Sequence, residues 1–193
     1  MQQTFIEDKT FDKSNFTQNY ITKGEYENCT FIACDFSNSD LGKIRFTECN
    51  FIRCNLSMVR LTQTAFSSIK FEDCKMLGLC FEDCSQFILS FSFHNCNLTH
   101  SSFYKTKIKK TIFKSSQLHE VDFVECDLSS SVFDNCDLTR ATFENTIIEK
   151  ADFRTSFNYS IDPEINRIKK AKFSLPGIPG LLGKYDIEID YTS

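Results

Sequence analysis

The sequence predicts an all-β solenoid with four-sided coils, because a large apolar residue stands at every fifth position over most of the chain. Five residues is the period of neither an α-helix nor a single β-strand. One phase of this pattern runs from Ile6 to Phe81 and a second runs from Phe93 to Phe153. Every position in both phases is Ile, Leu, Met, Phe or Tyr. We expect these side chains to point to the axis of the coil.

The recurrence of like residues every 20 positions sets the length of one coil. Phenylalanine recurs at 93, 113, 133 and 153, and leucine recurs at 98, 118 and 138. Four pentads therefore form one coil, and backbone hydrogen bonds join successive coils about 4.8 Å apart. The residue two positions before each large one is often small, and we expect it to turn inward because only a small group fits beside the stacked side chains. Residues 6–173 then form about 8 coils, in a rod roughly 40 Å long.

Tandem pentads of a small residue, any residue and then Leu or Phe are typical of one known family. The stretch SSSVFDNCDLTRATFENTIIEKADF, residues 129–153, is an example. This pattern resembles the pentapeptide-repeat family, whose fold is a right-handed quadrilateral parallel β-helix. The resemblance implies such a β-helix for residues 1–173, with an N-terminal cap at 1–5 and an irregularity at 82–92. Residues 174–193 are expected to form a short C-terminal cap of helix or strand and a dimerisation segment.

The five-residue period is interrupted between Phe81 and Phe93, which are 12 residues apart. Two pentads account for all but two of these residues, so the segment 82–92 contains a two-residue insertion. It is either a bulge that adjusts the solenoid or a protrusion that contacts a partner, since loops on a rigid scaffold often carry function. The residues expected to contact a partner there are Gln86, Phe87, Ile88 and Leu89.

The pattern ends near Phe173, and Pro176 and Pro179 then bracket a short apolar segment. The end of a solenoid exposes unpaired strand edges and needs a cover. This segment is either a cap folded onto its own rod or an isologous contact with a second copy. The ending resembles the tail of the bacterial fluoroquinolone-resistance pentapeptide proteins, which dimerise through this end. That resemblance implies a homodimer through Ile178, Leu181, Leu182, Tyr185 and Ile187.

The chain has 10 cysteines, and their positions favour packing over metal binding or disulfides. The C-x4-C spacing at 29–34 and 49–54 falls inside the range for a zinc site. However, eight cysteines stand two positions before a large apolar residue, and Cys84 does so if the first phase continues past Phe81. A small buried thiol suits that position. We expect no metal and no cofactor, and Cys80, outside this position, is expected to be the most reactive thiol.

No catalytic constellation is present, and the sequence contains no glycine-rich phosphate loop. The three histidines lie outside the inward positions with no nucleophile in register, so we do not expect an enzyme. The net charge of −4 gives no reason for direct binding to nucleic acid or to an anionic membrane. The opening MQQTFIEDKT does not form a signal peptide and no apolar run reaches about 18 residues, so the chain is expected in the cytoplasm.

Charge is unevenly distributed along the expected rod. Five lysines at 105–114 form a basic band with no acid among them, and residues 120–152 hold nine acids against two bases. Members of the fluoroquinolone-resistance subgroup mimic duplex DNA and bind DNA gyrase or topoisomerase IV, which they protect from quinolones. The resemblance implies the same function here, and the alternative is a cytoplasmic interaction scaffold for another protein. The acids expected to bind the partner are Glu120, Asp122, Glu125, Asp127, Asp134, Asp137 and Glu144.

Overall fold

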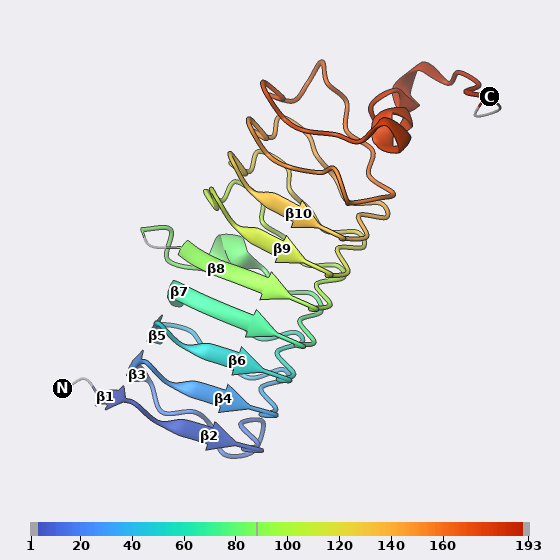
Figure 1. Cartoon of the computed structure of the whole chain (residues 1–193). Helices are drawn as coiled ribbons and strands as arrows, with labels where there is room; N and C mark the ends of the chain where they lie inside the picture. Colours follow the sequence, from blue (N-terminus) through green and yellow to red (C-terminus); the bar gives the residue numbers. More distant parts are fainter. Residues whose placement is uncertain (1–3, 88, 191–193) are drawn as a thin grey trace.

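The computed structural model describes residues 4–87 and 89–190, which form a continuous stack of coils (Figure 1). The first coil lies at one end of the rod and the C-terminal helices lie at the other (Figure 1). The described residues contain strands and three short 3₁₀ helices. The elements are β1 (Thr4–Glu7), β2 (Thr10–Asp12), β3 (Gly24–Glu27), β4 (Thr30–Ile32), β5 (Arg45–Thr47), β6 (Asn50–Ile52), β7 (Ala65–Glu72), η1 (Phe81–Asp83), β8 (Leu89–His94), β9 (Ile112–Lys114), β10 (Val132–Asp134), η2 (Leu175–Leu181) and η3 (Gly183–Tyr185).

The strands form a parallel β-solenoid, which confirms the predicted fold class. Every pair of neighbouring strands is parallel, and the partners lie about one coil apart in the sequence. β1, β3, β5 and the first half of β7 stack on one wall, which we call wall A. The next wall, wall B, is formed by β2, β4, β6, the second half of β7, β8 from Phe91 onward, β9 and β10. The start of β8 lies on wall A, where Leu89 pairs with Phe66.

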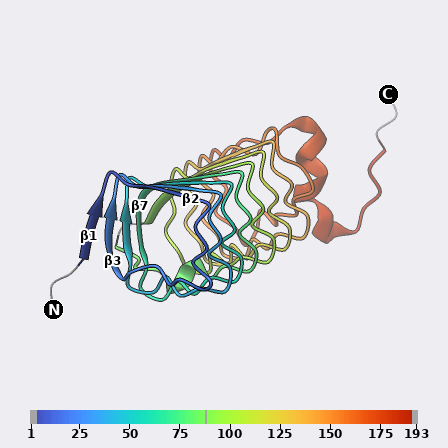
Figure 2. The same cartoon turned by 90° about the horizontal axis from the view of Figure 1, so that it is seen from below.

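Isolated bridges between coils form the other two walls. Wall C runs through bridges between residues 15 and 157, and wall D runs through bridges at residues 40–60 and 80–142. Wall A continues after β8 through bridges from Lys107 to Arg167. Viewed towards the end of the rod, the coils overlap in a four-sided outline (Figure 2). Each coil thus has one pentad on each wall, as the 20-residue recurrence predicts.

The large residue of each pentad points to the axis and forms the core. These residues are buried in both phases except Ile6 and Phe11, which are half-buried because they lie in the first coil, with no coil beneath them. On wall B one column is entirely phenylalanine, with neighbouring ring centroids 4.5 to 5.5 Å apart. Burying each ring contributes about 1.5–3 kcal/mol, which chain entropy opposes. The column consists of Phe11, Phe31, Phe51, Phe71, Phe93, Phe113, Phe133, Phe153 and Phe173.

The residue two positions before each large one also turns inward, but it is not always small. The cysteines at this position are buried, and Cys84 is among them. Cys54 Sγ, for example, donates to Phe31 O of the preceding coil at 3.3 Å. The expectation that only small groups fit is wrong, since larger residues are buried at this position even in adjacent coils, as Ile69 and Phe91 are. The larger buried residues at this position are Ile44, Val59, Ile69, Leu79, Phe91 and Val121.

The corners of the coils carry residues in the left-handed backbone conformation, spaced five positions apart. Gly78 is the one glycine among those described, and the others bear side chains. Each L residue held in this conformation costs about 1–2 kcal/mol. The corner N–H groups donate to the neighbouring coil, as Asn28 N does to Thr47 O at 3.0 Å and Lys105 N does to Val124 O at 3.0 Å. These hydrogen bonds between coils offset the backbone strain.

The repeat break lies on wall A between η1 and β8. β8 pairs with β7, and the register of this pair shifts between Phe66 and Ile69. The side-chain amide of Gln86 donates to the carbonyls of residues 81, 82 and 84 at 3.0 to 3.3 Å. Phe91 enters the core against the rings of residues 81, 93 and 103. The intervening loop projects from the side of the rod next to β8 (Figure 1).

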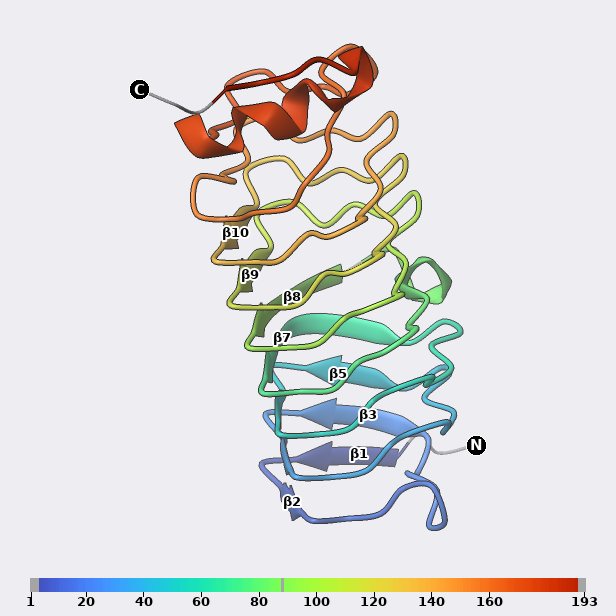
Figure 3. The ribbon, with the colours of Figure 1, turned by 90° about the vertical axis from the view of Figure 1, so that its right-hand side faces the viewer.

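The C-terminal segment folds onto the last coil of its own rod, with η2 and η3 lying across the end (Figure 3). A Cβ atom at Gly177 or Gly180 would clash with Tyr159, so glycine permits the close approach of η2. Ile161 N donates to Gly180 O at 2.9 Å, and Leu181 packs against the core. Residues 174–190 contain no strand, so the cap within the described residues is helical followed by an irregular segment.

Candidate functional site

Within residues 4–87 and 89–190, no group of three or more His, Cys, Asp or Glu side chains is arranged to hold a metal ion. No helix in this described part of the chain is long and apolar enough to cross a bilayer. The sequence predicts binding surfaces at three sets of residues, namely the acids, the repeat break and the C-terminal end. Their positions in the structure are described in turn.

Four of the seven predicted acids lie on or beside wall D. Asp122 takes part in the column of bridges on this wall, and Glu125 and Glu144 belong to the same column of pentads. Glu120 occupies the corner between walls C and D, in the left-handed conformation typical of corners. These four acids come closest to the single surface that the sequence predicts.

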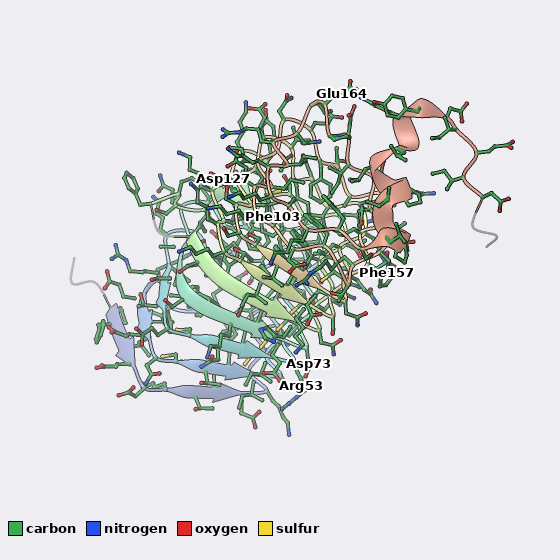
Figure 4. All side chains as sticks on the ribbon, turned by 45° about the horizontal axis from the view of Figure 1, so that its top comes forward. Arg53, Asp73, Phe103, Asp127, Phe157 and Glu164 are labelled. Carbon is green, nitrogen blue, oxygen red and sulfur yellow. The ribbon has the colours of Figure 1, made fainter. Side chains whose placement is uncertain are left out.

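The other three acids lie on three different walls. Asp127 bridges to Lys107 on wall A, Asp134 ends β10 on wall B, and Asp137 belongs to the bridges of wall C. The Asp127 side chain is largely covered, at 13% exposure, and Phe103 is fully buried (both labelled in Figure 4). The structure therefore does not bring the seven acids together, because four walls divide each stretch of 20 residues.

Three of the acids also shape the backbone. Asp122, Asp127 and Asp137 each accept a hydrogen bond from the backbone N–H two positions later, at 2.8, 3.1 and 3.1 Å. Such Asx turns fix the course of the chain through a corner. For Asp137, burial raises the pKa, but hydrogen bonds from Thr139 and other neighbours outweigh it and lower the pKa to about 2. These carboxylates are turn-forming groups as well as surface charges.

The lysine band lies one coil away from several of the acids and compensates part of their charge. The exposed ion pairs among them contribute about 0–1 kcal/mol each, so their main effect is on the surface field. Asp127 is the exception, because its side chain is 13% exposed. The lysine band and the acids are separate segments of the sequence. The spacing of about 20 residues between a lysine and its acid is the signal that would predict these ion pairs. The pairs of the band are Lys105–Glu125 at 3.5 Å, Lys109–Asp127 at 3.1 Å and Lys114–Asp134 at 4.0 Å. Outside the band, Arg140 pairs with Glu120 at 3.4 Å.

Wall D nevertheless carries an acidic strip, which we define as Glu82, Asp83, Asp122, Glu125 and Glu144. The pentads 79–83, 101–105, 121–125 and 141–145 stack on this wall, and they contain a single base, residue 105. Burial raises the pKa of Glu82, and the charges of Asp83 and Asp122 raise it further. The linear sequence does not reveal Glu82 and Asp83 as part of the strip. Assigning each residue to a wall by its place in the coil would have found them.

At the repeat break, two of the predicted contact residues, Gln86 and Phe87, are exposed, and Phe87 presents an apolar ring to solvent. Its side chain is 98% exposed. The Gln86 amide is turned back onto the backbone, and Leu89 is half-buried against the core. Ile88 lies outside the described residues. The break therefore offers one exposed ring, halfway along wall A.

The five residues predicted at a dimer interface fall into two groups. Leu181 packs against the core and Leu182 is half-buried, so both belong to the cap of their own rod. The other three are exposed, together with two apolar residues that the sequence reasoning does not include. A homodimer through this end stays a prediction that rests on the exposed group. The exposed apolar residues of this end are Leu175, Ile178, Tyr185, Ile187 and Ile189.

Cys80 is exposed and the other nine cysteines are buried, as the repeat pattern predicts. Desolvation raises the pKa of Cys80, and the neighbouring charges of Glu82 and Asp83 raise it further. The thiolate, which is the reactive form, is therefore disfavoured at neutral pH. The acidic strip thus works against the reactivity expected for this thiol.

A family model of the pentapeptide repeat region matches residues 24–91 and 87–157, which together make up more than half of the chain. The chain belongs to the pentapeptide-repeat family. A comparison with curated proteins finds no match.

Three solved structures of QnrB1, a plasmid-mediated fluoroquinolone resistance protein, are similar to this pentapeptide-repeat chain. Two trypsin-treated forms each have a TM-score of 0.62. The first is 18% identical, and the alignment covers 98% of this chain and 100% of that one. The second is 20% identical, and the alignment covers 97% of this chain and 98% of that one. The full-length form has a TM-score of 0.56 at 19% identity and covers 95% of this chain and 97% of its own. At this level of identity the likeness shows the fold.

Proposed function

We propose that this pentapeptide-repeat protein binds a protein partner through the acidic strip on wall D, and that the partner is DNA gyrase or topoisomerase IV. The strip would occupy the cationic surface on which the topoisomerase binds DNA, and the bound rod would protect the enzyme from quinolones. The observation that carries this proposal is a row of carboxylates on one wall of a stacked, rigid core. In this role the chain performs no chemistry.

The charge density of the acidic strip supports mimicry of a DNA strand. Its four pentads rise about 4.8 Å per coil, so five carboxylates lie along about 14 Å of the rod. The average density is therefore close to that of one DNA strand, whose phosphates lie about 3.4 Å apart. The spacing is uneven, because the acids stand on three of the four coils and the remaining coil holds Lys105. A cationic groove that accepts a phosphate backbone would therefore meet a similar density of negative charge.

The construction of the rod supports binding without rearrangement. The strip is carried on coils that are joined by backbone hydrogen bonds, such as Phe103 N to Asp122 O at 2.8 Å. A preorganised surface loses less conformational entropy when it binds. Lys105 pairs with Glu125 and weakens the field of the strip, so we expect charge to govern the association rate and its salt dependence more than the final affinity.

Gyrase supercoiling in the presence of ciprofloxacin tests the proposal, with the purified protein titrated from zero to several micromolar. The wild-type chain is expected to restore supercoiling. The double variant Glu125→Lys, Glu144→Lys is expected to need about 10-fold more protein, because two attractive contacts become repulsive. The matched control Glu72→Lys, Asp73→Lys reverses acids at the corresponding pentad positions of wall B and should act like the wild type.

Two results would contradict the proposal. One is the absence of rescue with both gyrase and topoisomerase IV from the native host. The other is equal rescue by the wall D variant and its wall B control, which would show that the acidic strip is not the contact. In either case the alternative, a scaffold for another protein, becomes the function to pursue by pull-down from the host.

A further inference from the structure

Wall A carries opposite charge on its two halves. Before the repeat break, the pentads 4–8, 24–28, 44–48 and 64–68 hold five acids and one arginine. After it, the pentads 106–110, 126–130, 146–150 and 166–170 hold seven bases and two acids. We call these the acidic half and the basic half of wall A. The net charge of −4 for the whole chain conceals this separation.

Much of the charge on wall A is not compensated within the chain. Both acids of the basic half are already paired, Asp127 with Lys109 at 3.1 Å and Glu149 with Arg167 at 2.7 Å. The other five bases of this half form no ion pair with the described residues. A surface of this kind attracts a partner with the reverse order of charge.

We propose that this partner is a second copy of the chain, bound antiparallel through wall A so that each acidic half faces the other copy's basic half. The repeat break lies at the middle of the wall, with four pentads of wall A before it and four after it. A twofold axis through the break therefore brings every coil of one copy opposite a coil of the other. The contact is isologous and lies away from the C-terminal end. It does not depend on the function proposed for wall D.

The register that this axis imposes matches opposite charges towards the ends of the wall, whereas the lysines of the pentad 106–110 face the uncharged pentad 64–68. The first coil faces the last and the third faces the seventh, with equivalent pentad positions opposite each other. Glu7 then faces Lys169 and Asp8 faces Lys170 of the second copy, and Arg45 faces Asp127. The twofold axis creates each of these contacts twice. One like-charge pair arises, Glu27 with Glu149, and there the charge of Glu149 is compensated by its ion pair with an arginine at 2.7 Å.

The axis lies between the two walls and runs along the coil at the break, so Phe87 lies beside it. Only residues next to a twofold axis meet their own counterparts, so the two Phe87 rings would face each other. A 98% exposed ring on a charged wall is otherwise left in water. Sheets that pack face to face lie about 10 Å apart, a gap that long side chains from both walls can fill. An antiparallel dimer through wall A would thus account for both the projecting loop and the change in the sign of the charge on either side of it.

The size of wall A predicts a weak and salt-sensitive dimer. Nine coils at about 4.8 Å and three residues per strand give a wall of roughly 40 by 10 Å. Pairing two such walls buries on the order of 800 Å² in total, below the range of about 1,200–2,000 Å² for stable interfaces. Exposed charges are screened over about 10 Å at 0.1 M salt. We therefore expect association at micromolar concentrations that weakens as salt is added.

Disulfide cross-linking at the axis tests the proposal in the full-length chain. Cys80→Ser removes the exposed native thiol, and Phe87→Cys places a new thiol at the break. With diamide as oxidant, covalent dimers are expected to form about 10-fold faster at low salt than at high salt, because screening weakens the contact. Tyr20→Cys in the same background is the control, since its parent side chain is 80% exposed on another wall. It should cross-link slowly at both salt concentrations.

Charge reversal completes the test in the Phe87→Cys background. Lys169→Glu with Lys170→Glu, or Glu7→Lys with Asp8→Lys, should each abolish the rapid cross-linking, because like charges then meet at both ends of the wall. Mixing the two variants should restore it. A control that changes the net charge equally on another wall, Lys13→Glu with Arg53→Glu, should cross-link like the parent.

Three outcomes would overturn the proposal. They are cross-linking at position 87 that salt does not affect, reversal variants that fail to complement each other, and dimers in solution that are never linked through position 87. The last outcome would place self-association at the C-terminal end instead. Circular dichroism of each variant confirms that a loss of cross-linking is not a loss of fold.

Discussion

Asp137 shows how a single carboxylate serves both the backbone and the surface. Its Oδ1 atom accepts hydrogen bonds from Thr139 N at 3.1 Å and Thr139 Oγ1 at 2.7 Å. Asn158 from the next coil donates to it at 2.9 Å, and His119 Nε2 from the preceding coil lies 2.9 Å from Oδ2. The neighbours in other coils are present only when the solenoid is folded. An acid that the sequence predicts as a partner contact is therefore also a structural part of wall C.

We predict that Asp137 stabilises the fold above about pH 4 and that this contribution is lost in acid. Its folded pKa is about 2, below the value of about 3.9 in an unfolded chain. A lowered folded pKa gives stability that is fully present above the unfolded value and is lost as the pH falls through the folded value. Because the side chain is 25% exposed, solvent screens these interactions only in part, and we expect an effect of about 1–2 kcal/mol.

The variant Asp137→Asn tests this, because it keeps the size of the side chain and cannot ionise. Its free energy of unfolding should fall less than that of the wild type between about pH 4 and pH 2. Urea unfolding at each pH measures the difference. Carbon NMR of the Asp137 carboxyl group measures the titration directly, and a midpoint near pH 4 would show that the hydrogen bonds do not act as described.

At the scale of elements, the five-residue period predicts the coils because every pentad has the same local structure. A large side chain turns inward, a second residue packs beside it and a corner follows. Phe31 in β4 and Phe133 in β10 lie where the period places them. The period alone does not state which wall a polar residue faces, since that depends on its position within all 20 residues of the coil. For this reason the linear sequence misses Glu82 and Asp83.

The repeat break is visible in the sequence, but its exposed residue follows only from closer comparison with the repeat. Omitting Gln86 and Phe87 leaves Cys84, Ser85, Ile88, Leu89 and Ser90, a regular pentad with a small first residue and a large third one. This explains the 98% exposure of Phe87. It does not reproduce the register, because Leu89 is the residue that pairs with the large residue Phe66 of the preceding coil. The cap is different, because its position depends on contacts with Tyr159 that no local pattern encodes.

We predict that Gly180→Ala detaches the cap from the last coil. The new Cβ would clash with the carbonyl oxygen of Tyr159, which belongs to the backbone and cannot turn aside. The expected loss is about 1–3 kcal/mol in the free energy of unfolding, with faster hydrogen exchange across residues 174–185. The control Gly183→Ala places its Cβ 3.6 Å from the nearest atom, Ser160 Oγ, and should exchange like the wild type. Equal protection in the two variants would mean that η2 does not depend on this close approach.

At the scale of the whole molecule, the rod is a one-dimensional stack in which each coil contacts its neighbours. Charge follows the same geometry. The acidic strip on wall D begins at Glu82 and Asp83, just before the break, and continues beyond it, where the basic half of wall A lies on the neighbouring wall. Two adjacent walls can therefore serve different partners, although the total charge of −4 suggests neither surface. The stacked phenylalanines in the core fix the distance between coils, and therefore the spacing of the charges on both walls.

The stack predicts that the same substitution costs more in the middle of the rod than at its end. Phe113 is fully buried, with rings 5.2 and 4.8 Å away on its two sides, whereas Phe11 is half-buried and stacks on one ring, Phe31, at 4.8 Å. Phe113→Ala leaves a closed cavity and should cost about 3–5 kcal/mol. Phe11→Ala should cost about 1–2 kcal/mol, because part of the ring is already in water. Guanidinium unfolding measures both losses. Equal losses would show that the first coil is as tightly coupled to the rod as the central ones, contrary to a stack whose stability is a sum over neighbouring coils.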